Sequence, residues 1–343
     1  MKKNTLSIIL IILLIVSIVL IAGCTQSTKQ TDSNEQSAPS TPQEQKETVK
    51  YPNKQINLII QAAPGGLSDL VARTVGGQLE QILGVPVVCS NKPGASGAVA
   101  MSYLQASAPD GYTLGYVPVE LSMIKALGFA DIEPNSFDLI ESSNISPATV
   151  TVSANAKWKT LQEFIDYAKN NPEKVKIGNS GTGSIWHIAA ASLEKATGVK
   201  FNHVPFDGAA PAVAALMGGH IDAVTVSVME VKSGVESGKL KVLGVMSEQR
   251  SEYLPDVPTL KEAGYDVNVA AWGGFAAPKG LPQEVKDVLY PAFEKAINSE
   301  KMKEVAKQRG FSIFYKSSEE FTKFANEQFD FYMKLIPTMG LKK

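Results

Sequence analysis

Three short turns in this sequence combine glycine and proline with hydroxyl side chains in a way that suits anion binding. They span residues 64–69, 93–97 and 180–184, and each separates an apolar, strand-like run from a pattern of helical spacing. Backbone N–H groups at the start of a helix have no partner within the helix and carry partial positive charge. The sequence therefore predicts that a carboxylate or phosphate binds where these turns meet, held by N–H groups and hydroxyls without an arginine.

The turns supply four hydroxyls that are candidate ligand contacts: Ser68, Ser180, Thr182 and Ser184. Each serine could instead cap its own helix, and Ser68 or Asp69 is the expected cap of the first helix. For the set as a whole, a shared anion site is the better explanation, because turns of this kind lie at the carboxyl ends of strands, where ligands bind in open α/β sheets.

Four further side chains lie next to these turns or at another strand end: Glu120, His187, Phe206 and Asp207. His187 either donates a hydrogen bond into the cleft or packs beside Trp186. Phe206 would supply an aromatic wall. Glu120 and Asp207 would bind an ammonium or hydroxyl group or repel extra negative charge, which favours such a ligand over a bare tricarboxylate.

A secreted hydrolase is the enzyme alternative, using Ser68 or Ser184 with His187 and either Asp69 or Asp207. The chain lacks the Gly-x-Ser-x-Gly turn that presents a catalytic serine in many α/β hydrolases. Its three histidines have no Cys or His partner at the spacing of a metal site. We therefore expect no catalytic residues, no metal and no cofactor.

Strand-like runs alternate with amphipathic helices along residues 51–343, which predicts an α/β fold with a mainly parallel sheet covered on both faces. The pattern suggests that the chain leaves a first lobe near Val150 and returns around Trp272. We expect lobe 1 to comprise residues 51–150 and 272–343, and lobe 2 residues 151–271. Two crossovers would join the lobes, and the cleft between them would hold the ligand.

The N-terminal region predicts export. Lys2 and Lys3 precede an apolar run that ends in Gly23-Cys24, as in a secretory signal. The ending resembles a bacterial lipoprotein signal, which would make residues 1–23 the signal peptide and Cys24 the lipidated residue. A retained membrane anchor is the alternative. Residues 24–50 are polar and predict a disordered tether. The folded part would then lie on the extracytoplasmic side of the cell membrane.

Charge further limits the partners. The 33 Lys and Arg residues nearly balance the 34 Asp and Glu residues, which argues against a nucleic-acid-binding protein. We expect a monomer whose partners are a small ligand and proteins of the membrane.

Taken in order, several motifs resemble those of the extracytoplasmic solute receptors of tripartite tricarboxylate transporters, also called Bug-type receptors. The resemblance covers residues 51–343 and rests on these segments: Ala63-Pro64-Gly65-Gly66 with Ser68-Asp69 and Ala72-Arg73, Asn91-Lys92-Pro93-Gly94-Ala95, Pro109-Asp110-Gly111-Tyr112-Thr113-Leu114, residues 181–187, His203-Val204-Pro205-Phe206 with Ala210-Pro211-Ala212, Gly218-Gly219-His220-Ile221-Asp222 and Leu254-Pro255-Asp256-Val257-Pro258-Thr259.

The resemblance implies a two-lobed periplasmic-binding-protein fold, type II-like, that closes on a carboxylated solute and delivers it to a membrane permease. Carried over to this chain, the family's ligand contacts fall on Gly65, Gly66, Ser68, Asp69, Ser180, Gly181, Thr182, Gly183, His187, Phe206 and Asp207. The solute could be a di- or tricarboxylate, an amino acid or an aromatic acid. A sensor that signals to a membrane partner is the alternative to transport.

One departure concerns the ligand. Members commonly have Pro-Phe before Ala-Pro-Gly-Gly, and this chain has Gln61-Ala62. An aromatic wall is therefore absent here.

Overall fold

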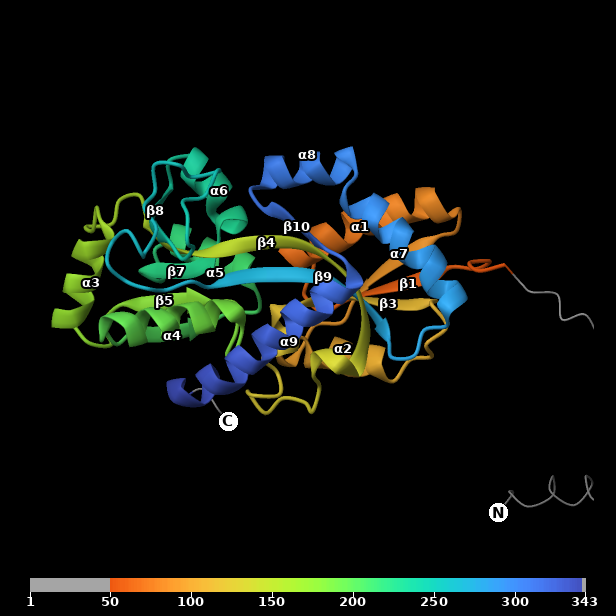
Figure 1. Cartoon of the computed structure of the whole chain (residues 1–343). Coiled ribbons are helices and arrows are strands. Elements are labelled where there is room, and N and C mark those ends of the chain that lie inside the picture. The colour runs from red at the N-terminus through yellow and green to blue at the C-terminus, as the bar shows by residue number, and fades with distance from the viewer. Residues whose placement is uncertain (1–49, 341–343) are drawn as a thin grey trace, which may run out of the picture. The chain divides into compact units, whose positions relative to one another are not determined.

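The computed structural model describes residues 50–340. The predicted signal peptide, Cys24 and all of the tether except Lys50 lie outside the described residues. Figure 1 shows that the described part is a sheet with helices on both faces. The predicted α/β fold is confirmed.

The first half of the sheet is built from β1, β2 and β3, which run parallel, together with the strands that join them from later in the chain. Leu58 at the centre of β1 lies opposite Cys89 on one side and Leu114 on the other. Helices connect these strands, as parallel pairing requires. The elements are β1 (Ile56–Ile60), α1 (Leu67–Leu83), β2 (Val87–Asn91), η1 (Ala95–Gly97), α2 (Ala98–Gln105), β3 (Thr113–Pro118), η2 (Val119–Ser122) and η3 (Pro134–Ser136).

The second half of the sheet repeats this construction. Strand β5 pairs in parallel with both β6 and β7. The elements are α3 (Leu161–Asn170), β5 (Lys176–Asn179), α4 (Ile185–Thr197), β6 (Asn202–Pro205), α5 (Ala209–Met217), β7 (Ala223–Ser227), α6 (Val228–Glu236) and β8 (Leu240–Val245).

Two long strands join the halves, and they correct the prediction of a mainly parallel sheet. Strand β4 (Phe137–Ser153) pairs with β9 (Ala270–Pro278) as far as Pro147, and with β7 and β8 from Ala148 onward. All of these pairs are antiparallel, as are β3 with β9 and β4 with β10. A chain that passes out of one half and back again must traverse the sheet in both directions, so its centre is antiparallel.

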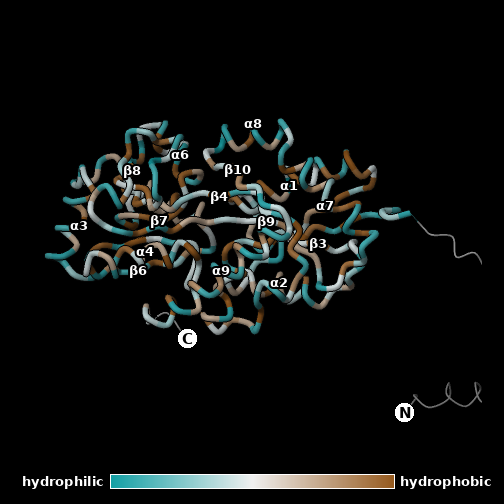
Figure 2. The backbone as a smooth tube through the Cα atoms, viewed as in Figure 1, coloured by the Kyte–Doolittle hydropathy of each residue, from teal (hydrophilic) through white to brown (hydrophobic). Residues whose placement is uncertain are grey.

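The C-terminal segment returns to the first half. Helix α7 covers α1, and α9 packs against β4 and η2, beneath the two long strands in Figure 1. Figure 2 shows that α8 is largely hydrophilic along its length. The elements are α7 (Gln283–Ile297), α8 (Glu300–Arg309), β10 (Ser312–Lys316), α9 (Ser318–Leu335) and η4 (Ile336–Met339).

Apolar side chains from the strands and the inner helix faces form two buried clusters. One gathers β1, α1 and α7, and the other extends from α2 through β4 to α4, β7 and α6. In residues 50–340 we find no helix with both the length and the hydrophobicity needed to cross a bilayer.

Candidate ligand-binding cavity

A cavity of about 690 Å³ lies where loops from the two halves of the sheet meet. The first half contributes residues 61–64, 66–68 and 93–97 together with Tyr116, Pro118 and Glu120. The second half contributes Ser180, residues around the start of α4, residues 206–211 and Glu230, and Ala271 and Trp272 of β9 also line the cavity. The three turns predicted to bind an anion all line this cavity.

The N-terminus of α1 has no side-chain cap, which leaves backbone N–H groups of its first turn available. The helix begins after Gly66, which is the N-cap and offers no side-chain cap. The expected cap by Ser68 or Asp69 is therefore wrong. Asp69 lies in the first turn of the helix, and its carboxylate accepts hydrogen bonds from the Gly65 N–H at 3.1 Å and from Arg73 at 2.9 Å. Asp69 thus holds the turn in place through its hydrogen bond to Gly65. Gly65 can adopt the required backbone conformation, with a φ of +95°, because it has no side chain.

Helix α5 presents a second uncapped N-terminus. Its N-cap is Gly208, with a φ of +124°, and no side chain caps the helix. Serine and aspartate rarely adopt this backbone conformation, so the usual capping residues are excluded here. Gly208, Ala209 and Ala210 line the cavity. The partial positive charge of this helix end therefore faces the cavity.

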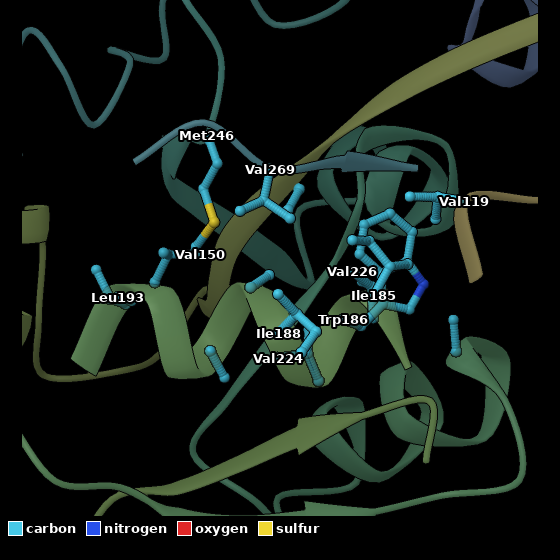
Figure 3. Close-up of a cluster of buried hydrophobic side chains, with 14 of the residues drawn as sticks. Val119, Val150, Ile185, Trp186, Ile188, Leu193, Val224, Val226, Met246 and Val269 are labelled. Carbon is cyan, nitrogen blue, oxygen red and sulfur yellow. The ribbon is translucent and has the colours of Figure 1, made fainter. Parts of the chain in front are cut away.

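Two backbone N–H groups at the start of α4 already have hydrogen-bond acceptors within the protein. Ser184 caps the helix by accepting the His187 N–H at 3.3 Å, and the carboxylate of Glu120 accepts the Ile185 N–H at 3.1 Å. Figure 3 shows Ile185 and Ile188 packed towards Val224 and Val226 of β7. This packing holds the N-terminal turn of α4 against the sheet and close to Glu120.

A chain of hydrogen bonds runs from three residues that line the cavity, Gln61, Ser68 and Tyr116, to Asn144 of β4. The Gln61 side-chain amide donates to the Ser68 hydroxyl at 2.9 Å, Ser68 bonds to the Tyr116 phenol, and that phenol donates to Asn144 at 2.9 Å. Because Asn144 accepts from the Tyr116 phenol, Tyr116 must accept from Ser68, and Ser68 must accept from the Gln61 amide. The carbonyl oxygen Oε1 of Gln61 is left buried and without a partner among the described residues.

Two glutamates from different elements line the same cavity. Burial raises the pKa of Glu120 above its ordinary value. Burial, and to a smaller extent the neighbouring charge of Glu120, raise the pKa of Glu230 to about 7. Glu230 accepts hydrogen bonds from the N–H and hydroxyl of Ser227, at 2.7 and 2.8 Å, and the N–H bond is one half of the capping box of α6.

Comparison with known proteins identifies the family. Residues 71–341 match the model of the tripartite tricarboxylate transporter family receptor, TctC. The chain belongs to this family.

Relatives and solved structures agree with this assignment. The receptor is 33% identical to the "UPF0065 protein in gbd 5'region" of Cupriavidus necator, over 87% of this chain and 91% of that protein. It is similar to a TctC solute-binding protein from Polaromonas, with 38% identity, a TM-score of 0.68 and coverage of 84% and 100% of the two chains. The periplasmic binding protein BugD is 29% identical, with a TM-score of 0.79 and coverage of 85% and 100%. The receptor therefore has the fold of extracytoplasmic solute-binding proteins.

The predicted ligand contacts of the receptor fall into two groups. Those that line the cavity are Gly66, Ser68, Glu120, Ser180, Gly181, Thr182, Ser184, Phe206 and Asp207. Those that do not are Gly65, Asp69, Gly183 and His187. His187 lies behind the cavity, where its Nδ1 accepts the Gly183 N–H at 3.0 Å and its ring packs edge-on against His203. Burial lowers the pKa of His187 to about 4, so the imidazole is neutral.

The arrangement does not assemble the residues of a hydrolase. Within residues 50–340, His187 makes no side-chain hydrogen bond to either candidate serine, and Asp69 is engaged by Arg73 and Asn91. The family is one of receptors and not of enzymes.

Sequence reasoning missed Glu230 and gave no contact role to Gln61. The signal for Glu230 was available, because Ser227 and Glu230 have the spacing of a capping box at the end of a strand. Trp272, near which the chain was expected to return to lobe 1, lines the cavity, and its ring packs edge-on against Phe321 and Phe324.

Proposed function

We propose that this receptor captures a small carboxylate in the cavity and delivers it to a tripartite-type membrane permease. The observation that carries the proposal is the pair of uncapped helix N-termini, at Gly66 of α1 and Gly208 of α5, that border one cavity. A carboxylate there would accept hydrogen bonds from backbone N–H groups that no side chain of the protein caps. Nothing in this site needs to be consumed, so we expect no catalysis.

Capture would involve closure of two lobes, residues 51–150 with 272–343 and residues 151–271. The change of partners along β4 near Pro147 supports this division. A direct contact also bridges the two sets of loops: the Ser96 hydroxyl donates to the Thr182 carbonyl at 3.3 Å. A ligand that contacts both sides favours the closed form, and a permease could recognise that form.

Thermal unfolding against a panel of carboxylates tests the proposal. The protein is unfolded and refolded to remove carried-over ligand, then melted with each acid and with the corresponding neutral amide as a matched control. A ligand at 100 times its Kd adds about 2.7 kcal/mol to the free energy of unfolding. This corresponds to several degrees in a protein of this size. Equal effects of acid and amide, or no effect of any acid, would contradict carboxylate capture.

Transport is tested separately in cells. Deletion of the gene should abolish uptake of the identified solute, and uptake should return when the receptor is restored. Binding in vitro together with unchanged uptake would favour the sensor alternative.

We also propose that a lipid on Cys24 anchors the receptor outside the membrane. The lipoprotein-like ending of the apolar run supports this. Labelling of cells with a radioactive fatty acid should mark the wild-type protein and the Cys89→Ala variant, and leave Cys24→Ala unlabelled. Labelling of Cys24→Ala would contradict the anchor.

A further inference from the structure

The charged groups that line the cavity are all acidic. They are Glu120, Glu230 and Asp207, and among the described residues that line it there is no Lys, Arg or His. A second carboxylate of a ligand would meet these groups in a partly enclosed site, where like charges repel more strongly than in water. The cavity wall therefore suits a ligand that carries a positive charge as well as its carboxylate.

Glu120 and Glu230 each have hydrogen-bond acceptor capacity left over after their contacts within the protein. Glu120 receives the Ile185 N–H on Oε1, and Glu230 receives both Ser227 hydrogen bonds on Oε2. The Glu120 carboxylate also accepts its own backbone N–H, and among the described residues no hydrogen bond reaches Glu230 Oε1. The two side chains come from η2 and α6, and Glu120 is close enough for its charge to act on Glu230.

Gln61 adds an independent observation that points to a ligand. Its side chain lines the cavity and is 8% exposed, and Oε1 has no donor among the described residues. The hydrogen-bond chain through Ser68 and Tyr116 fixes the amide so that the acceptor, and not the donor, is left over. A buried acceptor without a partner destabilises a protein unless something supplies a donor.

We propose that Glu120 and Glu230 form a cation subsite that binds an ammonium group of the ligand, and that Gln61 accepts a further hydrogen bond from the ligand. The solute is then an aminocarboxylate. This inference rests on the proposed function, since the carboxylate of the same ligand would bind at α1 and α5. Such a ligand places its carboxylate against the positive ends of α1 and α5, and its ammonium group against the two glutamates.

The titratable groups around the pair define the proton balance. The charge of Glu120 helps to raise the pKa values of Tyr116 in β3 and Tyr332 in α9, so both phenols are neutral. Asp207 is exposed at the edge of the cavity. Because the pKa of Glu230 is about 7, the free site retains part of a proton at neutral pH. Binding of an ammonium group releases that proton, and binding of a second carboxylate would take up more.

Calorimetry with matched ligands tests the subsite. The purified protein is titrated at pH 7 with aspartate and succinate, with glutamate and glutarate, and with 4-aminobutyrate and butyrate. We expect at least one amine-bearing member to bind ten or more times tighter than its partner, with net proton release. Glu120→Gln and Glu230→Gln should each remove at least tenfold of that preference.

The variants keep the fold intact, because glutamine still accepts the Ile185 or Ser227 N–H. Glu141→Gln is the matched control, since Glu141 is a buried carboxyl outside the cavity, and it should leave the preference unchanged. Tighter binding of the amine-free partner in every pair would overturn the cation subsite and leave carboxylate capture standing. Failure of all six ligands to bind would overturn the cation subsite, and the wider panel of acids in thermal unfolding would then decide carboxylate capture.

Discussion

Oε1 of Glu120 accepts the backbone N–H of Ile185 at 3.1 Å, so a carboxylate from the first half of the sheet closes the first turn of α4 in the second half. The same side chain lines the cavity. Glu120 therefore has two separable properties, a hydrogen-bond acceptor and a charge, and substitutions can remove one without the other.

Glu120→Ala should destabilise the unliganded protein relative to Glu120→Gln. Alanine leaves the Ile185 N–H without an acceptor, which costs about 1–3 kcal/mol for a buried group, whereas glutamine keeps the hydrogen bond. Urea unfolding of the two variants measures the difference. Equal unfolding midpoints would show that the contact contributes nothing to the folded state.

Gly66→Asp should stabilise the fold and weaken carboxylate binding. The backbone at Gly66 is extended, and a side chain there meets no atom within 4 Å. Aspartate would cap α1 and add a few tenths of a kcal/mol over glycine. Its carboxylate would occupy the N–H groups, and loss of two charged hydrogen bonds predicts an affinity about 100-fold weaker.

The control for Gly66→Asp is Gly77→Ala, because Gly77 lies in α1 away from the cavity with no atom within 4 Å of an added Cβ. It should add roughly 0.5–1 kcal/mol of stability and leave affinity unchanged. Full binding by Gly66→Asp would exclude the α1 terminus as the carboxylate site.

Glu141 should make stability fall as pH rises. The side chain is 3% exposed, its Oε2 has no partner among the described residues, and burial, with the charge of Glu294, raises its pKa to about 8. Above the ordinary value of 4.5 the unfolded chain loses this proton while the folded chain keeps it, so stability is lost between about pH 4.5 and 8. Glu141→Gln should gain stability over wild type across this window, measured by urea unfolding at intervals of pH.

His187 should make stability fall as pH falls, which is opposite to the effect of Glu141. Its pKa is about 4 in the folded protein against an ordinary 6.5, so below pH 6.5 the unfolded chain takes up a proton that the folded chain refuses. Stability is then lost as pH falls from 6.5 to about 4. His187→Asn, which can still accept the Gly183 N–H, should reduce this acid sensitivity in unfolding experiments. The exposed His220→Asn should not, and an equal effect of both would contradict the assignment.

Much of the fold could be predicted from the sequence, because helices such as α5 and strands such as β8 carry their own periodicity and end at glycines or polar residues. The directions of β4 and β9 could not, since strand pairing depends on residues far apart in the chain. Local pattern also left the use of Asp69 open. A carboxylate in a first helical turn can cap, bind a ligand or hold a loop, and only the positions of Gly65, Arg73 and Asn91 show that it holds the loop.

Strand β4 is a single strand of 17 residues that pairs with β9 and β10 in one half of the sheet and with β7 and β8 in the other. Melting either half strips its partners from the same strand, so we expect residues 50–340 to unfold as one cooperative unit and not as two domains. A solute that contacts only a few loops would then raise a single melting temperature for the whole receptor. Occupancy could be followed by heating alone, without a label on either molecule.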